Sequence, residues 1–137
     1  MNRPEEIRDV LTGSRTWFVV GLGDNPDRDA FGVARYLQQQ GKRIVPVHPR
    51  AQTVHGERGY ATIAEAAAEL GPPDVVDVFV NSSRAGEFAD QAIAAGAGCV
   101  WFQFGVIDDD AAQRVTDAGL TMVMDRCPLV EYPRLLD

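Results

Sequence analysis

The segment Val19–Leu37 most constrains the fold of this 137-residue chain. It passes from an apolar strand through a loop of Gly, Asp, Asn and Pro that carries Arg28, and then into an amphipathic helix. Gly21 and Gly23 let the backbone turn sharply and approach a ligand, and Asp29 is expected to cap the helix. Because a helix start presents free N–H groups and partial positive charge, the segment predicts an anion site.

Expected strands and helices alternate along the whole chain. The expected strands are Thr16–Leu22, Arg43–Val47, Val75–Val80, Cys99–Phe104 and Thr121–Met124, with a very short additional strand at Tyr60. Strands that alternate with helices at this spacing form right-handed crossovers and a parallel sheet. The sequence therefore predicts an α/β fold in one domain, residues 1–137. Its parallel sheet of five to six strands is doubly wound, with helices on both faces.

Capping residues and one buried carboxylate stand out within these elements. Thr62 and Glu65 form a capping box before an Ala-rich helix, and Ser82 or Ser83 is expected to cap the next helix. Asp77 interrupts the apolar run Val75–Val80. We expect it at the edge of the core, with its carboxylate satisfied by backbone or water.

Composition excludes several functions. The net charge of −7 argues against nucleic-acid or membrane binding, because a phosphate polymer would be repelled over most of the surface. With no long apolar run and no N-terminal signal pattern, we expect a cytoplasmic protein. Cys99 and Cys127 are then free thiols, and the absence of metal-ligand spacing predicts no metal site.

Topology places the ligand above the carboxyl ends of the strands, where successive crossovers go to opposite sides. With the first strand inside the sheet, this switch point falls between it and Val75–Val80. The loops expected there are 23–29, 48–50, 81–84, 103–105 and 125–127.

The second strand narrows the choice of ligand. A nicotinamide-type site needs Asp or Glu at the end of the second strand to hold the ribose hydroxyls. Here the second strand ends in His48, Pro49 and Arg50, and these residues suit a phosphorylated ribose. The third glycine of the dinucleotide fingerprint is displaced to Gly32, so that spacing is a weak match. The cations expected around the site are Arg28, Lys42, Arg43 and Arg50.

Four strings of the sequence are distinctive: VVGLGDNPDRDAFGVARYLQ, IVPVHP, VWFQFGV and VMDRCPLVEYPRL. Through them the sequence strongly resembles the stand-alone CoA-binding domain family, relatives of the N-terminal domain of succinyl-CoA synthetase α-subunits. The resemblance spans nearly the whole chain and implies a Rossmann-like domain that binds coenzyme A or an acyl-CoA, with the loop after the first strand holding the diphosphate. Family members mostly lack an assigned reaction.

The resemblance also implies roles for single residues. Gly23 stands where many relatives have Ser, and His48 replaces the more usual Asn. Asn81 stands where relatives often carry Arg, and Arg84 is expected to make the cationic contact in its place. Together with topology, this gives the predicted cofactor-binding set: Gly21, Gly23, Asp24, Asn25, Arg28, Gly32, Val33, His48, Pro49, Arg50, Asn81, Ser82, Arg84, Gln103, Gly105 and Cys127.

The sequence contains no convincing catalytic constellation, since neither His48 nor His55 has a nucleophile or acidic partner at triad spacing. Cys127 follows the last strand beside Arg126, so it is either a thiol with a lowered pKa that can react or a small core residue.

Three functional hypotheses remain. The leading one is a non-catalytic module that binds CoA or an acyl-CoA, with a regulatory or carrier role. The second is an NAD(P)-binding oxidoreductase-like domain. The third is a ligand-responsive interaction protein whose apolar tail, 128–136, docks on a protein partner or on a second subunit in a homodimer.

Overall fold

Five parallel strands form the sheet of the structure, a computed structural model that describes residues 1–136. The strands are β1 (Thr16–Val20), β2 (Arg43–Val47), β3 (Val75–Val78), β4 (Cys99–Phe102) and β5 (Thr121–Val123). Their order is β2-β1-β3-β4-β5, which confirms the predicted α/β architecture with five strands. The expected strand at Tyr60 is a single parallel bridge to Val47. β1 lies between β2 and β3, so the switch point falls where topology predicted it.

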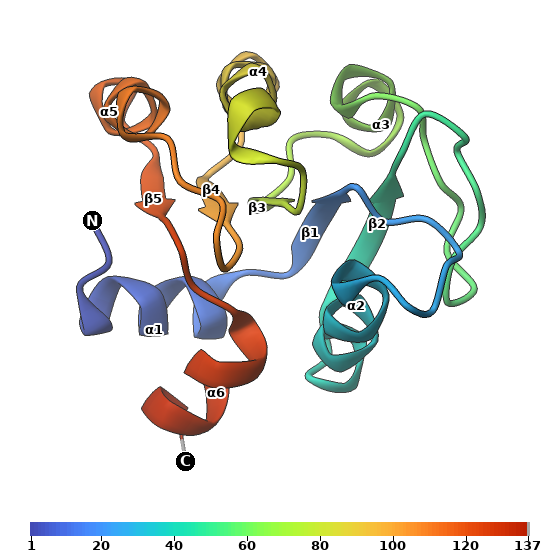
Figure 1. The fold of residues 1–137 in the computed structure, drawn as a ribbon, viewed down its shortest axis with the longest axis horizontal. Helices are drawn as coiled ribbons and strands as arrows, with labels where there is room; N and C mark the ends of the chain where they lie inside the picture. The colour runs from blue at the N-terminus through green and yellow to red at the C-terminus, as the bar shows by residue number, and fades with distance from the viewer. Residues whose placement is uncertain (137) are drawn as a thin grey trace.

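Helices cover both faces of the sheet (Figure 1). On one face lie α1 (Pro4–Gly13), α2 (Asp29–Gln39) and α6 (Pro128–Leu136), and on the other lie α3 (Ile63–Leu70), α4 (Ser82–Ala94) and α5 (Asp109–Asp117). Side chains alternate between the two faces, so Trp17 and Trp101 pack under the first layer while Phe18 and Phe102 pack under the second. Both faces are therefore apolar, which explains the continuous hydrophobic runs of the strands. Within residues 1–136, no helix is long and apolar enough to cross a membrane.

The tail proposed to dock on a partner or on a second subunit folds as α6, and part of it packs against its own chain. The Tyr132 hydroxyl donates to the carbonyl of Leu11 at 3.0 Å, and its ring meets Tyr36 edge-on, with the ring centroids 5.7 Å apart. Glu131 is buried and pairs with Arg126 and Arg134, at 3.4 Å each. No helix was predicted from the sequence for this segment, because Pro133, inside the helix, masks the helical pattern.

The helix starts differ from the predicted ones in two places. Asn81, not a serine, caps α4, and its side-chain oxygen accepts from the Ser83 amide at 2.9 Å. The N-cap of α2 is Arg28, whose extended backbone precedes Asp29, so Asp29 is the first helical residue rather than the cap. The Thr62 cap is confirmed.

Replacing Thr62 by alanine tests the cap of α3. The Glu65 amide donates to the Thr62 hydroxyl at 3.0 Å, and the variant leaves that amide without its acceptor. We expect the free energy of unfolding, measured by urea denaturation, to fall by about 1 kcal/mol. The control Thr53→Ala, at an exposed loop position, should change it by less than about 0.5 kcal/mol. Equal effects of the two variants would mean that the cap contributes nothing.

Asp77 lies in the middle of β3, fully buried between its sheet neighbours Val19 and Trp101. Neither carboxyl oxygen has a hydrogen-bond partner within residues 1–136, and burial raises the pKa of this group well above its usual value. The expected position at the edge of the core is therefore wrong, and no backbone group of residues 1–136 satisfies the carboxylate. A lone carboxylate inside a strand gives no sequence signal of how deep that strand lies.

Candidate functional site

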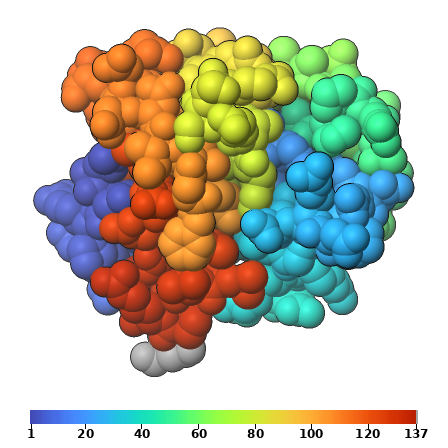
Figure 2. All heavy atoms as spheres, in the orientation of Figure 1, coloured from blue at the N-terminus to red at the C-terminus, as the bar shows by residue number. Residues whose placement is uncertain are grey.

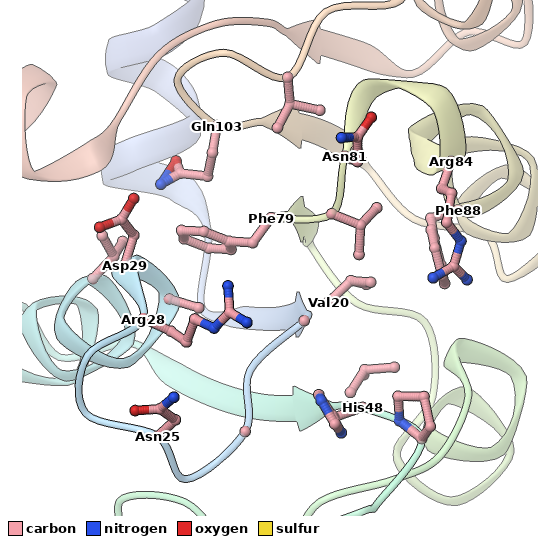
Figure 3. A pocket seen from close by; sticks show the side chains of 18 of the residues that line it. Val20, Asn25, Arg28, Asp29, His48, Phe79, Asn81, Arg84, Phe88 and Gln103 are labelled. Carbon is pink, nitrogen blue, oxygen red and sulfur yellow. The ribbon is translucent and has the colours of Figure 1, made fainter.

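A cleft of about 1370 Å³ opens at the carboxyl ends of the strands, lined by the loops after β1, β2, β3 and β4 and by the first turns of α2, α4 and α6 (Figure 3). Sites for drug-sized ligands usually measure about 300–1,000 Å³. The cleft therefore has room for a long ligand that crosses several strands.

The loop between β1 and α2 is shaped for a close ligand. Gly21 has a φ of +96°, and a Cβ there would lie 3.4 Å from the Cβ of Phe79, so a side chain would be strained and crowded. Asn25 holds the next turn, because its side-chain oxygen accepts from the Asp27 amide at 2.9 Å. The chain then enters α2, where the Phe31 amide donates to the Arg28 carbonyl at 3.1 Å and the amides before it have no acceptor within the helix. This is the arrangement that binds anions at helix N-termini.

Two of the three arginines that line the cleft are available to a ligand. Arg28 and Arg50 are exposed, and neither forms an ion pair with a residue in the described part of the chain. Figure 3 shows the Arg28 side chain extending over the cleft from the start of α2. Arg84 is already engaged, with Glu87 at 2.8 Å and with the ring of Phe88, 5.5 Å from the ring centroid.

Lys42 and Arg43 do not belong to this cluster, contrary to expectation. They lie at the amino end of β2, about 17 Å of strand away from His48. The Lys42 ammonium donates to the carbonyl of Ser14, and partial burial lowers its pKa although Asp74 opposes this. Nearness in sequence to the second strand misled the prediction, because the two ends of a strand face opposite edges of the sheet.

The loop after β2 is tied to the loop after β1. The ring Nδ1 of His48 accepts from the Arg50 amide at 3.1 Å, so in the neutral ring Nε2 carries the proton, on the edge that faces Gly23. Gln52 accepts from the Asp24 amide at 3.1 Å and joins the two loops. The sequence prediction missed Gln52, since one glutamine in an irregular loop gives no periodic or motif signal.

The other end of the cleft holds Gln103 and Cys127. Gln103 is 5 % exposed, its amide donates to the Cys127 sulfur at 3.8 Å, and its oxygen has no partner within residues 1–136. Burial raises the pKa of the Cys127 thiol, and the charges of Asp77 and Asp29 add to this. Of the two possibilities for Cys127, the thiol with a lowered pKa is wrong, because the Arg126 guanidinium pairs with buried Glu131 and the pKa of the thiol is raised.

All but two of the predicted site residues line the cleft. The exceptions are Ser82 and Gly105, which shape the loop between β4 and α5: the Ser82 hydroxyl donates to the Gly105 carbonyl at 3.0 Å and accepts from the Ile107 amide at 2.9 Å. The same loop is held by Asp125, which accepts from the Gly105 amide at 2.8 Å. Phe104, within the expected segment 103–105, also lines the cleft, and the lining residues missed from the sequence are mostly apolar and include Phe79, Phe88, Val106 and Leu129.

Charge is mixed around the cleft rather than uniformly positive. The lining carboxylates are Asp24, Asp27, Asp29 and Glu87. Asp29 lies in the first turn of α2, where the helix dipole favours a carboxylate, and Figure 3 shows its side chain near that of Gln103. An anionic ligand is therefore favoured only near Arg28, Arg50 and the α2 amides. In the part of the chain that the structure describes, no three His, Cys, Asp or Glu side chains gather as a metal site would need.

Comparisons with known proteins agree with the geometry. An uncharacterized protein of Bacillus subtilis (strain 168), YneT, is 33 % identical over 127 residues, covering 93 % of this chain and 92 % of that protein. The solved structure of a hypothetical protein from Pyrococcus horikoshii OT3 has a TM-score of 0.91 at 35 % identity, covering 98 % of this chain and 93 % of that one. A Thermus thermophilus protein has a TM-score of 0.89 at 34 % identity, covering 98 % and 99 %. Residues 15–133 match the sequence profile of the CoA binding domain family, and this protein belongs to that family.

Proposed function

We propose that this protein binds coenzyme A or an acyl-CoA as a non-catalytic module with a regulatory or carrier role. The observation that carries the proposal is that Arg28 lies in the cleft at the N-terminus of α2. The neighbouring carboxyl end of β2 has no carboxylate side chain. Charge-assisted contacts and helix amides suit a diphosphate, and an Arg50 side chain suits a phosphorylated ribose.

The rest of the cleft supports a direction for this ligand. The adenosine end lies by His48 and Arg50, the diphosphate by the loop between β1 and α2, and the pantetheine arm runs over β3 toward Gln103 and Cys127. The unpartnered Gln103 oxygen suits an amide N–H of that arm.

The side chains capable of chemistry support a binding role. His48 and Cys127 are not paired with each other, since His48 accepts from the Arg50 amide and the Cys127 sulfur accepts from Gln103. The raised pKa of Cys127 also keeps its thiol protonated.

Calorimetry with CoA and with NAD tests the proposal. Without a carboxylate at the end of β2 to hold a ribose diol, we expect CoA to bind at least tenfold more tightly than NAD, a difference of about 1.4 kcal/mol. NADP serves as a third arm, because it carries a ribose phosphate without a pantetheine arm. Equal affinities for CoA and NAD, or tighter binding of NAD or NADP, would overturn the proposal.

A further inference from the structure

The cleft changes in chemical character along the strand order. Its β2 and β1 end carries the cations Arg28 and Arg50, together with His48. Beyond β3 and β4 the lining includes Phe104 and Leu129, with the uncharged Cys127 thiol between polar and apolar parts. A ligand that fits this gradient has an anionic head and an apolar far end.

The apolar end is open to solvent. Phe104 is 58 % exposed and Leu129 is 42 % exposed. Figure 2 shows the loop after β4 lying against the start of α6 on the same face of the molecule as the start of α2. Exposed apolar groups that border a ligand cleft mark a place where further apolar surface binds.

This apolar end is built on fixed elements. The loop that carries Phe104 is closed by a hydrogen bond from the Val106 amide to the Gln103 carbonyl at 2.9 Å. Leu129 lies in the first turn of α6, which Tyr132 anchors to α1. The two side chains are therefore held at the rim by their backbones rather than by mobile segments.

Gln103 marks where the polar part of the ligand ends. Its unpartnered oxygen lies on a side chain that is 5 % exposed and lines the cleft, and Phe104 follows directly in sequence. If Gln103 binds the last amide of the pantetheine arm, the sulfur and the group attached to it lie beyond, against Phe104 and Leu129.

We infer that Phe104 and Leu129 form a subsite for the hydrocarbon chain of an acyl-CoA. The preferred ligand is then a CoA thioester with an apolar acyl group rather than free CoA. This inference rests on the proposed function and adds to it the class of acyl group. Thioesters that end in a carboxylate are disfavoured, because the chain end would be desolvated and the negative charge of Asp29 acts on Cys127 in the same cleft.

Titration calorimetry with CoA, hexanoyl-CoA and succinyl-CoA tests the inference. We expect hexanoyl-CoA to bind at least tenfold more tightly than CoA, and succinyl-CoA no more tightly than CoA. In Phe104→Ser and in Leu129→Ser, the ratio of hexanoyl-CoA to CoA affinity should fall at least threefold. The matched control is Ile107→Ser, an exposed apolar residue of the same loop that does not line the cleft, and it should keep the wild-type ratio.

The outcomes separate the inference from the proposed function. CoA binding with equal affinity for hexanoyl-CoA would overturn the subsite and leave CoA binding intact, whereas no binding of either would overturn both. A preference for hexanoyl-CoA that survives both serine variants places the acyl chain elsewhere and also overturns the inference. If equal affinities accompany a dimer in analytical ultracentrifugation that Leu129→Ser dissociates, the apolar surface belongs to a second copy of the chain.

Discussion

Replacing Arg28 by alanine is expected to weaken CoA binding by about 1.5–3 kcal/mol, about 10- to 150-fold in dissociation constant. Arg28 lines the cleft at the N-terminus of α2 and forms no ion pair within residues 1–136, so its charge is available to a phosphate. The backbone N–H groups of α2 remain in the variant, and they account for the residual binding. Isothermal titration calorimetry at fixed ionic strength measures the change.

The melting temperature of the ligand-free variant should stay close to that of the wild type. The Arg28 side chain is exposed, and although Arg28 is the N-cap residue, its side chain makes no capping hydrogen bond. The control is Arg35→Ala on the same helix, whose side chain donates to Gln38 at 3.1 Å and does not line the cleft. This variant should bind CoA as the wild type does. Wild-type affinity in Arg28→Ala would show that Arg28 is only a solvated surface charge.

The position of the cleft follows from sequence because topology determines it. Once strands and helices alternate, the carboxyl ends of parallel strands meet at one edge, and the loops after β1, β2, β3 and β4 must gather there. This reasoning predicted Arg28, His48 and Gln103 without any knowledge of contacts, and all three line the cleft. The separate expectation that Lys42 and Arg43 join the site was wrong, because they lie at the amino end of β2 rather than at its carboxyl end.

The apolar and supporting parts of the site could not be predicted in the same way. Phe104 was expected at the site as the end of a strand, but β4 ends at Phe102, so its exposure at the rim was not predicted. Leu129 entered the site only because the last segment folds as α6, which Pro133 obscured. Gln52 depends on the path of an irregular loop, and local sequence does not determine such a path. These contacts arise from packing between distant segments.

Replacing Asp77 by asparagine or valine is expected to raise the free energy of unfolding by about 1–3 kcal/mol at pH 7. The carboxyl group is fully buried between two apolar sheet neighbours and has no hydrogen-bond partner within residues 1–136. In the unfolded chain the same group is hydrated, so folding at pH 7 must either bury a charge or bind a proton. Asparagine removes the ionisation at nearly constant shape, and valine removes the polar atoms as well.

The sign of the pH dependence follows from the direction of the shift. Burial raises the pKa of Asp77 in the folded protein above its ordinary value of 3.8, so the folded state binds the proton more tightly than the unfolded state. Its contribution to stability is fully present below pH 3.8 and is lost as the pH rises through the folded pKa. Urea denaturation of the wild type from pH 4 upward should therefore show that the contribution of Asp77 to the free energy of unfolding declines. Asp77→Asn should not show this decline.

Asp9→Asn is the matched control, because Asp9 is exposed on α1, and it should change stability by less than about 0.5 kcal/mol at each pH. A less stable Asp77→Asn at pH 7, with the wild type gaining stability relative to it as the pH rises, would mean that the folded protein holds Asp77 ionised by a favourable interaction. The expected result would mean that Asp77 destabilises the folded protein at pH 7. Asp77 would then lower the stability of the sheet directly below the cleft, two residues before Phe79, which lines the cleft.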